Sequence, residues 1–576
     1  MSLLPFGELA PYRERRFLPT TVDWNEWDAI EPLFDLLEIR LGAAQTGAEL
    51  ERWLGDWSEL TAAIGEESAR RYIGMTCHTE DAEAERAYLD FVEQIEPELK
   101  PRQFQLERMY LAHPARGDLP AGRYREFDRH AEVHVALYRD ENVPLETEEA
   151  RIGQQYQKVS GAMTVTFQGE EKTLVQMGRY LEEPDRALRQ EAWERVAERR
   201  LKEKETFESQ FDELVRLRHR IANNAGYGSY RDYAFPLRGR FDYTPADCEA
   251  FHAAIEAEMV PLLRELQEER RQRLGVGTLR PWDLMVDVAN RPPLRPFEQV
   301  DGLETGTERI MERLDAGLAE QFRQMRALKL LDLGNRKGKA PGGYQSSLPE
   351  ARLPFIFMNA VGQQRDVETL LHEAGHAFHT MATRDEDFYA YRDAPIEFCE
   401  VASMSMEFLG GEYLDAFYGA DDLRRARRDH LEGVVETFPW IAAVDAFQHW
   451  IYTHPEHTRE ERAAAWNGLM NRFGGDTDWT GWESARSWSW HRQLHVFLYP
   501  FYYVEYGLAQ IGALQVWLRS REDRGAALAG YKRALGLGGS RPLPDLFEAA
   551  GCRFAFDRET LGPLATLLRA ELRALA

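Results

Sequence analysis

Cysteine is scarce in this chain, which has four among its 576 residues. Their positions follow neither the spacing of a disulfide framework nor that of a metal-binding cysteine pair. Scattered thiols of this kind are typical of proteins in a reducing compartment. We therefore expect a cytoplasmic protein whose cysteines are reduced and buried, namely Cys77, Cys248, Cys399 and Cys552.

Long apolar runs are also absent. No stretch of about 20 apolar residues occurs, which is the length that a helix needs to span a bilayer. The first residues, MSLLPFGE, lack the apolar core of a signal peptide. Acidic residues outnumber basic ones: the chain has 97 Asp and Glu but only 71 Lys and Arg, which gives a net charge of -26. This balance argues against nucleic acid or an anionic membrane as a partner and favours cationic peptides.

The most informative motif present is His372-Glu373-Ala374-Gly375-His376, an HExxH sequence. Its flanks contain no proline, which favours a helix, and histidines four residues apart lie on one helical face. Both imidazoles can then bind one zinc ion, which in a hydrolytic site takes three protein ligands and leaves a position for water. Glu373 is expected beside the metal as the base for that water. The spacing therefore predicts a zinc-dependent hydrolase.

The third metal ligand is expected from a second helix, in the segment IEFCEVASMSME. Glu400 and Glu407 share one face of that helix, and no Lys or Arg lies between Asp393 and Leu423 to pair with them. Carboxylates without basic partners need water or a cation. We expect Glu400 to bind the metal and Glu407 to orient a ligating histidine. His379 competes for the third position, and a plain acidic surface is the other alternative.

An aromatic cluster lies near the C-terminus. His495, Tyr499, Tyr503 and Tyr506 follow one another at steps of four, four and three residues, the spacing of one helical face, and Pro500 is predicted to start the regular helix. Such a stripe can be an aromatic core. Phenol and imidazole donors are also what the hydrolysis of an amide needs to hold the oxyanion.

A glycine loop precedes the HExxH motif and leads into a short β-rich run. Gly342, Gly343 and Tyr344 form its centre, and no G-K-S/T follows, so it is not a phosphate-binding loop. The pattern agrees with a structural hairpin, and equally with an edge strand to which an extended peptide adds by main-chain hydrogen bonds. We take these three residues as candidates for substrate binding.

These stretches together resemble a known family, the zinc oligopeptidases that include thimet oligopeptidase, neurolysin and oligoendopeptidase F. Ala402 and Met404 stand where the thimet branch has Pro and Gln, so the resemblance is closest to oligoendopeptidase F. The matching sequences lie in about the C-terminal two thirds of the chain: HEAGHAFH from His372, EVASMSME from Glu400, RPWD from Arg280, and GYGSYRDYAF and RFDYTPADC between Gly226 and Cys248.

The resemblance implies roles for individual residues. It implies one zinc ion per chain, bound by His372, His376 and Glu400, with Glu373 as general base. It further implies a zincin-like catalytic domain, enclosed by N-terminal helices that form the wall of a deep channel. The residues it implies over the zinc, as oxyanion donors or further substrate contacts, are His495, Tyr503 and Tyr506, followed by Tyr499 and Tyr502.

Helical periodicity dominates the chain, and we expect a mainly α fold with a small β element. We place a domain boundary near residue 200, with an N-terminal helical region at 1–200 and a catalytic zinc metallopeptidase domain at 201–576. The predicted helices are Ala44–Ile64, Glu66–Glu96, Asp185–Asn224 and Pro245–Leu274, and the predicted strands are Ala162–Phe167 and Pro354–Met358.

The favoured function is that of a zinc metalloendopeptidase that hydrolyses internal bonds of short, unstructured peptides. One alternative is a metallocarboxypeptidase with the same motif, which needs a cationic clamp for the terminal carboxylate of its substrate. The other is a non-catalytic, zinc-containing peptide-binding protein, in which Glu373 has no purpose. The sequence does not indicate an oligomeric state.

Overall fold

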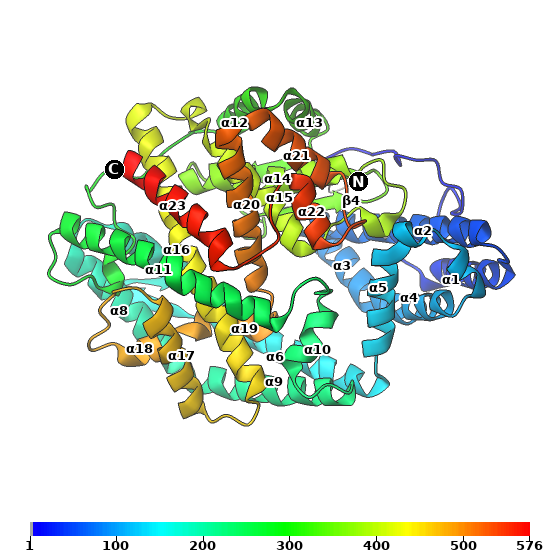
Figure 1. The fold of residues 1–576 in the computed structure, drawn as a ribbon, viewed down its shortest axis with the longest axis horizontal. Helices are drawn as coiled ribbons and strands as arrows, with labels where there is room; N and C mark the ends of the chain where they lie inside the picture. The colour runs from blue at the N-terminus through cyan, green and yellow to red at the C-terminus, as the bar shows by residue number, and fades with distance from the viewer. Residues whose placement is uncertain (1–3) are drawn as a thin grey trace. The chain divides into compact units, whose positions relative to one another are not determined.

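The computed structural model describes residues 4–576 and is drawn in Figure 1. Its internal contacts divide the chain into two units, each assembled from three segments. The first unit comprises the chain up to Ala136, Leu294–Arg427 and Gly512–Phe554, and the second comprises Leu137–Pro293, Arg428–Ile511 and Ala555–Ala576. The predicted domain boundary near residue 200 stays a prediction.

The first unit is mostly helical. Its α-helices are α1 (Trp27–Ala43), α2 (Gly47–Cys77), α3 (Ala82–Asp90), α4 (Glu96–Leu111), α5 (Ala121–Leu137), α12 (Val300–Leu314), α13 (Ala316–Ala327), α14 (Gln364–Ala382), α15 (Ile396–Gly411), α21 (Arg524–Leu535) and α22 (Leu543–Ala550). Short turns of other helix types are η1 (Phe91–Ile95), η2 (Pro114–Asp118), η6 (Tyr389–Tyr391) and η7 (Leu414–Ala416).

A three-stranded sheet supports the helices of this unit. The strands are β3 (Leu331–Gly334), β4 (Tyr344–Leu348) and β5 (Leu353–Ala360), in the order β3-β5-β4. β5 is parallel to β3 and antiparallel to β4, and its residues are almost all buried, as expected of the central strand. Helix α14 packs on β5 and β4, so the sheet lies directly against the helix of the HExxH motif.

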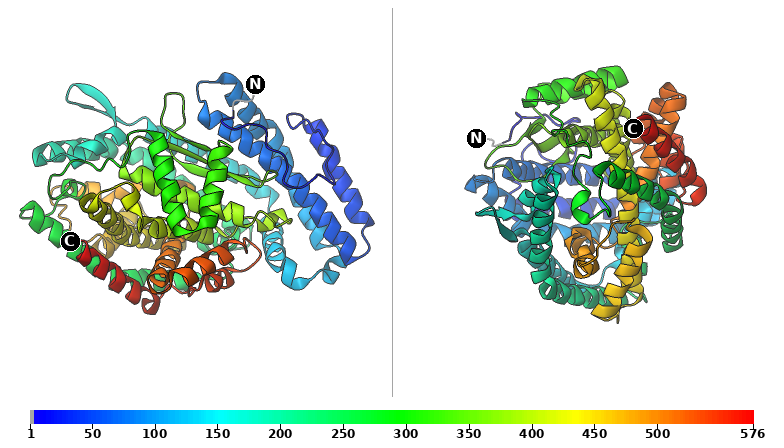
Figure 2. Two further views of the ribbon diagram at one scale, coloured as in Figure 1. Left: turned by 90° about the horizontal axis from the view of Figure 1, so that it is seen from above. Right: turned by 90° about the vertical axis from the view of Figure 1, so that its left-hand side faces the viewer.

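The N-terminal helices of the first unit pack around an aromatic core. In the left view of Figure 2 the blue helices α1, α2 and α4 lie side by side, in agreement with their mutual contacts. Trp53, Trp57 and Tyr110 are buried there, and the core extends to Phe388 and Tyr391 in the loop after α14. Burial of aromatic surface therefore ties this loop to the N-terminal helices.

The second unit contains the remaining short elements and several long helices. They are η3 (Asp140–Asn142), α6 (Val143–Gly161), β1 (Thr164–Phe167), β2 (Glu170–Thr173), α7 (Leu174–Met177), η4 (Gly178–Glu182), α8 (Arg186–Lys202), α9 (Lys204–Asn224), α10 (Tyr230–Leu237), α11 (Pro245–Leu274), η5 (Pro281–Asp283), α17 (Arg459–Phe473), α18 (Glu483–Ser487), η8 (Ser489–Arg492), α19 (Leu494–Leu498) and α23 (Arg558–Ala574). Helices α16 (Ala420–Thr453) and α20 (Val504–Glu522) each belong in part to both units.

The mainly α fold class is confirmed, and the bounds of α11 agree with the prediction. Thr244 caps this helix in a capping box with Asp247, Pro245 occupies its first turn, and Gly275 ends it in the left-handed conformation with φ 66. These are the start and stop signals by which a helix is recognised in a sequence.

Other boundaries were predicted wrongly. Helix α2 runs through Gly65 without a break, and Glu66–Glu96 is divided among α2, α3, η1 and α4. A Cβ at position 65 would lie 3.1 Å from the hydroxyl of Tyr389, so this glycine serves a close contact and not a helix end. Glu203 separates α8 from α9 where one helix was expected.

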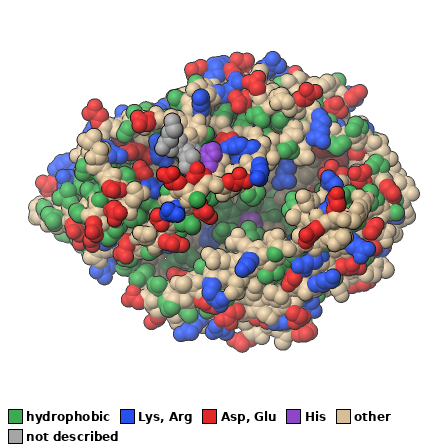
Figure 3. Space-filling view, turned by 180° about the vertical axis from the view of Figure 1, so that it is seen from behind, with side chains coloured by type: hydrophobic (Ala, Val, Ile, Leu, Met, Phe, Trp, Pro, Cys, Tyr) green, Lys and Arg blue, Asp and Glu red, His purple; other side chains and the backbone are tan. Residues whose placement is uncertain are grey.

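In the part of the chain that the structure describes, none of the helices combines the length and the apolar character needed to cross a membrane. On the face shown in Figure 3, acidic side chains are interspersed with basic ones. The net charge of -26 is therefore not gathered into one block on this face.

Candidate metal centre

Helix α14 places the two histidines of the HExxH motif on one face. The carboxylate of Asp366 accepts hydrogen bonds of 2.8 Å from the backbone N–H groups of Val361, Gly362 and Gln363, and so fixes the start of the helix. One turn separates His372 from His376, and their ring centroids are 5.0 Å apart.

Helix α15 brings Glu400 to these histidines. Its Oε2 lies 3.4 Å from Nε2 of His372 and 3.8 Å from Nε2 of His376. A tetrahedral zinc site with bonds of about 2.0–2.1 Å has neighbouring ligand atoms roughly 3.3 Å apart. The three side chains therefore fit a zinc ion closely, in both donor type and spacing.

Close packing of the two helices depends on Gly375. A Cβ at this position would lie 2.5 Å from Cα of Ser403 and 2.6 Å from the carbonyl oxygen of Ala402. Real Cβ atoms do not approach other backbone atoms so closely. The glycine inside the motif, which is unfavourable in a helix, is thus explained by the approach of the α15 backbone.

Two further side chains lie within hydrogen-bond distance of this group of three. Oε1 of Glu407 lies 2.6 Å from Nδ1 of His372. Since a carboxylate accepts, Nδ1 carries a proton toward Glu407, and Nε2, which faces Glu400, is the nitrogen left to bind a metal once it has lost its own proton. Ser403 donates from its hydroxyl to Oε2 of Glu400 at 3.2 Å. The sequence pointed to Glu407 for this position, and its role stays a proposal.

The electrostatics suit metal binding. Burial lowers the pKa of His376 to about 4, so its imidazole is neutral near pH 7, the form that binds a metal. Burial alone would raise the pKa of Glu400, but the hydrogen bond with His372 and the nearby ring of His376 lower it overall. The carboxylate is therefore ionised.

Glu373 is nearly buried, at 7% exposure, beside this set and outside the group of possible ligands. Burial raises its pKa to about 7, and the negative charge of Glu400 adds to the rise, while His372 and a backbone hydrogen bond with Gln345 act against it. A carboxyl group with such a pKa can both accept and return a proton near neutral pH.

His379 does not join the ligand group. It is buried, and burial lowers its pKa to about 4. Its ring packs edge-on against Phe398 at a centroid distance of 6.5 Å. The structure thus places His379 in the core behind the motif, where the sequence had left two alternatives.

Strand β4 follows the glycine loop and packs against α14, the helix of the HExxH motif. Gly342 has a φ of 101, in the region that favours glycine, and a Cβ there would meet nothing within 4 Å. The side chain of Tyr344 is held away from such open space, since its ring stacks on Phe357 at 4.8 Å and its hydroxyl lies 2.6 Å from that of Thr76. β4 is an edge strand of the sheet, so its outer backbone groups are the part suited to bind an extended peptide.

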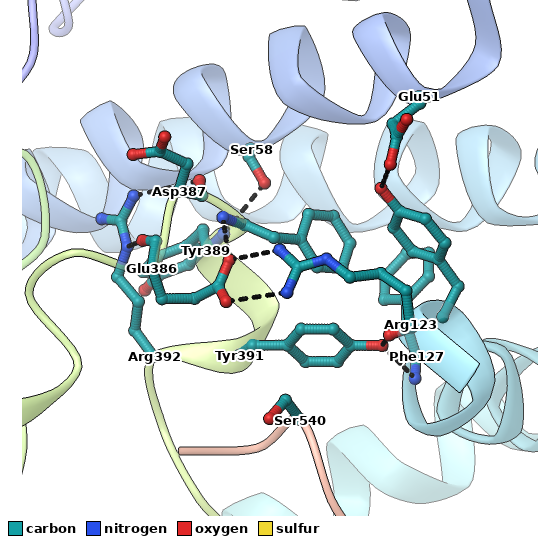
Figure 4. Close-up of polar contacts among 12 residues, drawn as sticks. Glu51, Ser58, Arg123, Phe127, Glu386, Asp387, Tyr389, Tyr391, Arg392 and Ser540 are labelled. Carbon is teal, nitrogen blue, oxygen red and sulfur yellow. Dashed lines mark hydrogen bonds and ion pairs between the residues drawn. The ribbon is translucent and has the colours of Figure 1, made fainter. Parts of the chain in front are cut away.

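The loop between α14 and α15 is clamped by the N-terminal helices (Figure 4). Arg123 donates two hydrogen bonds to Glu386, of 2.6 and 2.9 Å, and its carbonyl oxygen accepts one of 2.6 Å from the Tyr391 hydroxyl. The backbone N–H of Tyr389 donates to Ser58 at 3.0 Å. These contacts fix the connection that carries Glu400 toward the two histidines.

The aromatic cluster near the C-terminus forms within the second unit. The His495 ring centroid lies 4.9 Å from that of Tyr503, 5.7 Å from Tyr502, 5.9 Å from Tyr506 and 6.0 Å from Tyr499. Tyr499 is the most open of them, at 47% exposure. The residues of the predicted cluster therefore lie close together, although not on one helix, and their role stays a prediction.

The predicted helix start at Pro500 is wrong. His495 belongs to the short helix α19, and α20 begins only at Val504. Between them Phe501 adopts a φ of 65, its N–H donates to the Gln448 side chain at 2.9 Å, and its carbonyl accepts from Arg240. The N–H and carbonyl groups of Phe501 thus bond to side chains and not within a helix, so α20 begins after this residue.

Sequence reasoning missed Gln493, which determines the tautomer of His495. The indole N–H of Trp440 can only donate, and it donates to Oε1 of Gln493 at 3.0 Å. The amide nitrogen of Gln493 must then face Nδ1 of His495, at 2.8 Å. Nδ1 accepts, so Nε2 carries the proton. Burial, with the nearby charge of Arg238, lowers the pKa of His495 to about 4, and the ring is a neutral donor.

Two family models match this chain. The model of peptidase family M3 matches residues 179–564, and that of the peptidase M3 N-terminal domain matches residues 17–138. The chain belongs to peptidase family M3. The resemblance to this family that the motifs indicated is therefore confirmed, and both the metal ligand set and the aromatic cluster lie within the matched residues.

Several known peptidases are similar to this chain. Oligopeptidase PepF of Bacillus subtilis is 26% identical over 304 residues, which are 51% of this chain and 43% of that protein. The chromosomal oligoendopeptidase F of Lactococcus lactis subsp. cremoris is 24% identical over 232 residues, 40% of this chain and 37% of that protein. The aligned stretches thus span less than half the length of either relative. The structure of PZ peptidase A with an inhibitor is 28% identical, with a TM-score of 0.87 over 97% of this chain and 99% of that one.

Proposed function

We propose that this chain is a zinc metalloendopeptidase that cuts internal bonds of short, unstructured peptides. The observation that carries the proposal is the set of two imidazoles that face one carboxylate oxygen at 3.4 and 3.8 Å, with a second, buried carboxyl group beside them. The family and the oligopeptidase names of its relatives support the same activity.

His372, His376 and Glu400 would hold the metal, with His372 oriented by Glu407. Zinc bound by such a set lowers the pKa of water and polarises a carbonyl group. Glu373, with its pKa raised to about 7 by burial, takes a proton from the attacking water and returns it to the leaving amine. Glu400 would thus act as a ligand, Glu407 as the partner of His372 and Glu373 as the base, because the side chains around the three carboxylates differ.

Substrate binding is assigned to the edge of β4 and the glycines before it. Gly342 and Gly343 leave the approach to this edge free of side chains, and main-chain hydrogen bonds would hold an extended peptide whatever its sequence. A short, unstructured peptide adopts an extended conformation more readily than most segments of a folded protein do. The assignment therefore agrees with a preference for short, unstructured peptides.

The donors for the oxyanion are assigned to His495, Tyr503 and Tyr506, with Tyr499 and Tyr502 as further substrate contacts. His495 is neutral and carries its proton on Nε2, so it can donate without a change of charge. Burial raises the pKa of Tyr503, so its phenol keeps its proton as well. Both groups are thus in the donor state that an oxyanion requires.

A cytoplasmic location is part of the proposal. The four cysteines form no disulfide, and three of them, Cys77, Cys248 and Cys552, are buried. Reduced thiols of this kind are typical of a reducing compartment.

Digestion of a mixture of short synthetic peptides, with the products mapped by mass spectrometry, tests the proposed function. We expect internal cuts that a chelator abolishes and added zinc restores, and no cuts in a stably folded protein. Removal of single residues from C-termini would replace the proposal with a metallocarboxypeptidase. Metal-independent cutting, or zinc binding without any cutting, would contradict it.

A further inference from the structure

A second cluster of metal-binding side chains lies in the second unit, on helices α11 and α16. Cys248 and His252 are four residues apart on α11, and Asp445 and His449 are four residues apart on α16. Each pair therefore shares a helical face. All four side chains are buried, with residue exposures of 0% for Cys248 and Asp445, 5% for His252 and 6% for His449.

The contacts within this cluster leave several polar atoms unsatisfied. Nε2 of His252 lies 2.7 Å from Oδ2 of Asp445, a hydrogen bond. Nε2 of His449 lies 3.3 Å from the same oxygen but without hydrogen-bond geometry. Among residues 4–576, which the structure describes, neither ring nitrogen of His449 nor Oδ1 of Asp445 has a hydrogen-bond partner, although all three atoms are buried. A buried polar atom that remains unsatisfied destabilises the fold.

The surroundings do not supply the missing partners. The ring of His449 meets the rings of Phe501 and Phe235 edge-on, with centroid distances of 5.3 and 6.1 Å, and the ring of His252 at 5.6 Å. Aromatic edges and faces cannot replace a hydrogen bond to an imidazole nitrogen or a carboxylate. Asp445 is buried and has one carboxylate oxygen, Oδ1, without a hydrogen-bond partner, and such a group favours a cation nearby.

The donor atoms match one class of cation. One atom each of Cys248, Asp445 and His449 lies within 4.8 Å of the others. Sulfur, nitrogen and oxygen donors together are typical of zinc, whose bonds of about 2.0–2.3 Å require ligand atoms roughly 3.3–3.8 Å apart. Side-chain movements of about 1 Å would bring the three donors to these separations.

We infer that Cys248, Asp445 and His449 form a second, structural site for a zinc-type ion, distinct from the His372, His376 and Glu400 set. His252 orients Asp445 through its hydrogen bond to Oδ2. Binding converts the Cys248 thiol to a thiolate and releases its proton to solvent. The thiolate and the carboxylate then neutralise the two charges of the ion, and the ion links α11 to α16.

Cobalt provides a test, because only this second site contains sulfur. The full-length chain is freed of metal and titrated with Co(II) alone while its absorption is recorded. We expect two equivalents to bind and a thiolate-to-cobalt charge-transfer band to appear in the near ultraviolet. Cys248→Ser should remove the band and one equivalent. Cys552→Ser, at another buried cysteine, should keep both.

Two further measurements separate this site from the proposed catalytic one. His376→Ala should keep the charge-transfer band, so the second site stands even if the proposed peptidase activity fails. X-ray absorption spectroscopy at the zinc edge of the wild-type protein should show a sulfur neighbour at about 2.3 Å from zinc. This measurement does not depend on whether a variant folds. A single bound equivalent with no sulfur neighbour, or a band that survives Cys248→Ser, would overturn the inference.

Discussion

At the scale of single residues, the site depends on which carboxylate or imidazole completes the metal ligand set. Glu400 and His379 were both candidates from the sequence. In the structure Glu400 faces both Nε2 atoms of the motif histidines, whereas His379 packs against Phe398. The difference lies in which helix face each residue occupies.

Glu400→Ala should therefore lose one equivalent of zinc and the peptidase activity together. His379→Ala should keep the zinc content of the wild type, because its ring lies outside the ligand group. Metal analysis of both purified variants, with circular dichroism to confirm folding, checks this. A Glu400 variant that retains full zinc content would assign the third ligand elsewhere.

Gln493 acts on the reaction through His495. Replacement by Leu removes the amide that fixes the proton on Nε2, so the ring can hold its proton on either nitrogen and turn. We expect Gln493→Leu to lower kcat about tenfold with little change in KM, the size of effect seen when an orienting partner is lost. Nitrogen NMR of His495 should show proton density moving from Nε2 to Nδ1.

A structural role for Gln493 would give a different pattern. Loss of packing alone would lower Tm and leave the His495 tautomer and kcat unchanged. Trp440→Phe serves as the second variant, because it removes the hydrogen bond that orients the amide of Gln493 and leaves Gln493 in place. Its effect on kcat should be smaller than that of Gln493→Leu, since the amide still faces the ring.

The sequence indicated which side chains would lie close together where their spacing along a helix decides it, and their roles stay predictions. HExxH fixes its own geometry through helical spacing, and the absence of basic residues near Glu400 and Glu407 indicated a cation. Gln493 could not be found in this way. Its role depends on Trp440, which is 53 residues away along the chain and meets it only in the folded structure.

At the scale of secondary structure elements, the metal site depends on how closely α14 and α15 approach each other. Gly375→Ala should push the two helices apart, since the added Cβ would lie 2.5 Å from Cα of Ser403. We expect a loss of about 2 kcal/mol in the free energy of unfolding and weaker zinc binding. Gly433→Ala in α16 is the matched control, because its Cβ would meet nothing within 4 Å.

The control should be neutral or stabilising by up to about 1 kcal/mol, because alanine favours a helix over glycine. Chemical denaturation of both variants with and without zinc measures the comparison. If Gly375→Ala were as stable as Gly433→Ala and bound zinc normally, close backbone packing would not be what the motif glycine provides.

The loop before β4 is held by a buried ion pair. Lys339 donates to Asp332 at 3.0 Å and to the backbone carbonyls of Asp332, Gly334 and Met358, and Arg336 also pairs with Asp332 at 2.6 Å. Burial tends to raise the pKa of Asp332, but the hydrogen bonds from Arg336 and Cys77 and the charge of Lys339 lower it overall. The ionised carboxylate therefore stabilises the fold.

Asp332→Asn should lower the free energy of unfolding by about 2 kcal/mol at pH 7, the usual scale for hydrogen bonds to a charged group. Because the pKa is lowered in the folded state, this contribution is present above about pH 4 and is lost as the pH falls through the folded value. The gap in Tm between wild type and variant should therefore narrow as the pH falls below about 4. A gap independent of pH would mean that the charge of Asp332 is not involved.

The bounds of helices could be predicted where local sequence signals set them. The predictions were wrong where side chains from distant parts of the chain set them. The capping box and C-terminal glycine of α11 gave its bounds from the sequence. The start of α20 was missed because Arg240 and Gln448 hold the backbone of Phe501 out of the helix. Neither partner can be inferred from the local sequence around Pro500.

At the scale of the whole molecule, the two helices that carry the proposed metal ligands are joined by a loop that the N-terminal helices hold in place. Arg123, Ser58 and Tyr391 fix the loop between α14 and α15. The sequence predicted that the fold is mainly helical and that the family is the zinc oligopeptidases. It could not show this clamp, because each contact joins residues hundreds of positions apart.

The central claim is that Glu373 acts as a base beside a metal bound by other residues. The most direct measurement compares zinc content and turnover of Glu373→Gln with the wild type on one internally quenched peptide. The account predicts unchanged zinc content and unchanged KM, with kcat lowered by about a hundredfold or more, since the amide cannot accept the proton of the water. Near-normal kcat, or loss of zinc together with activity, would contradict it.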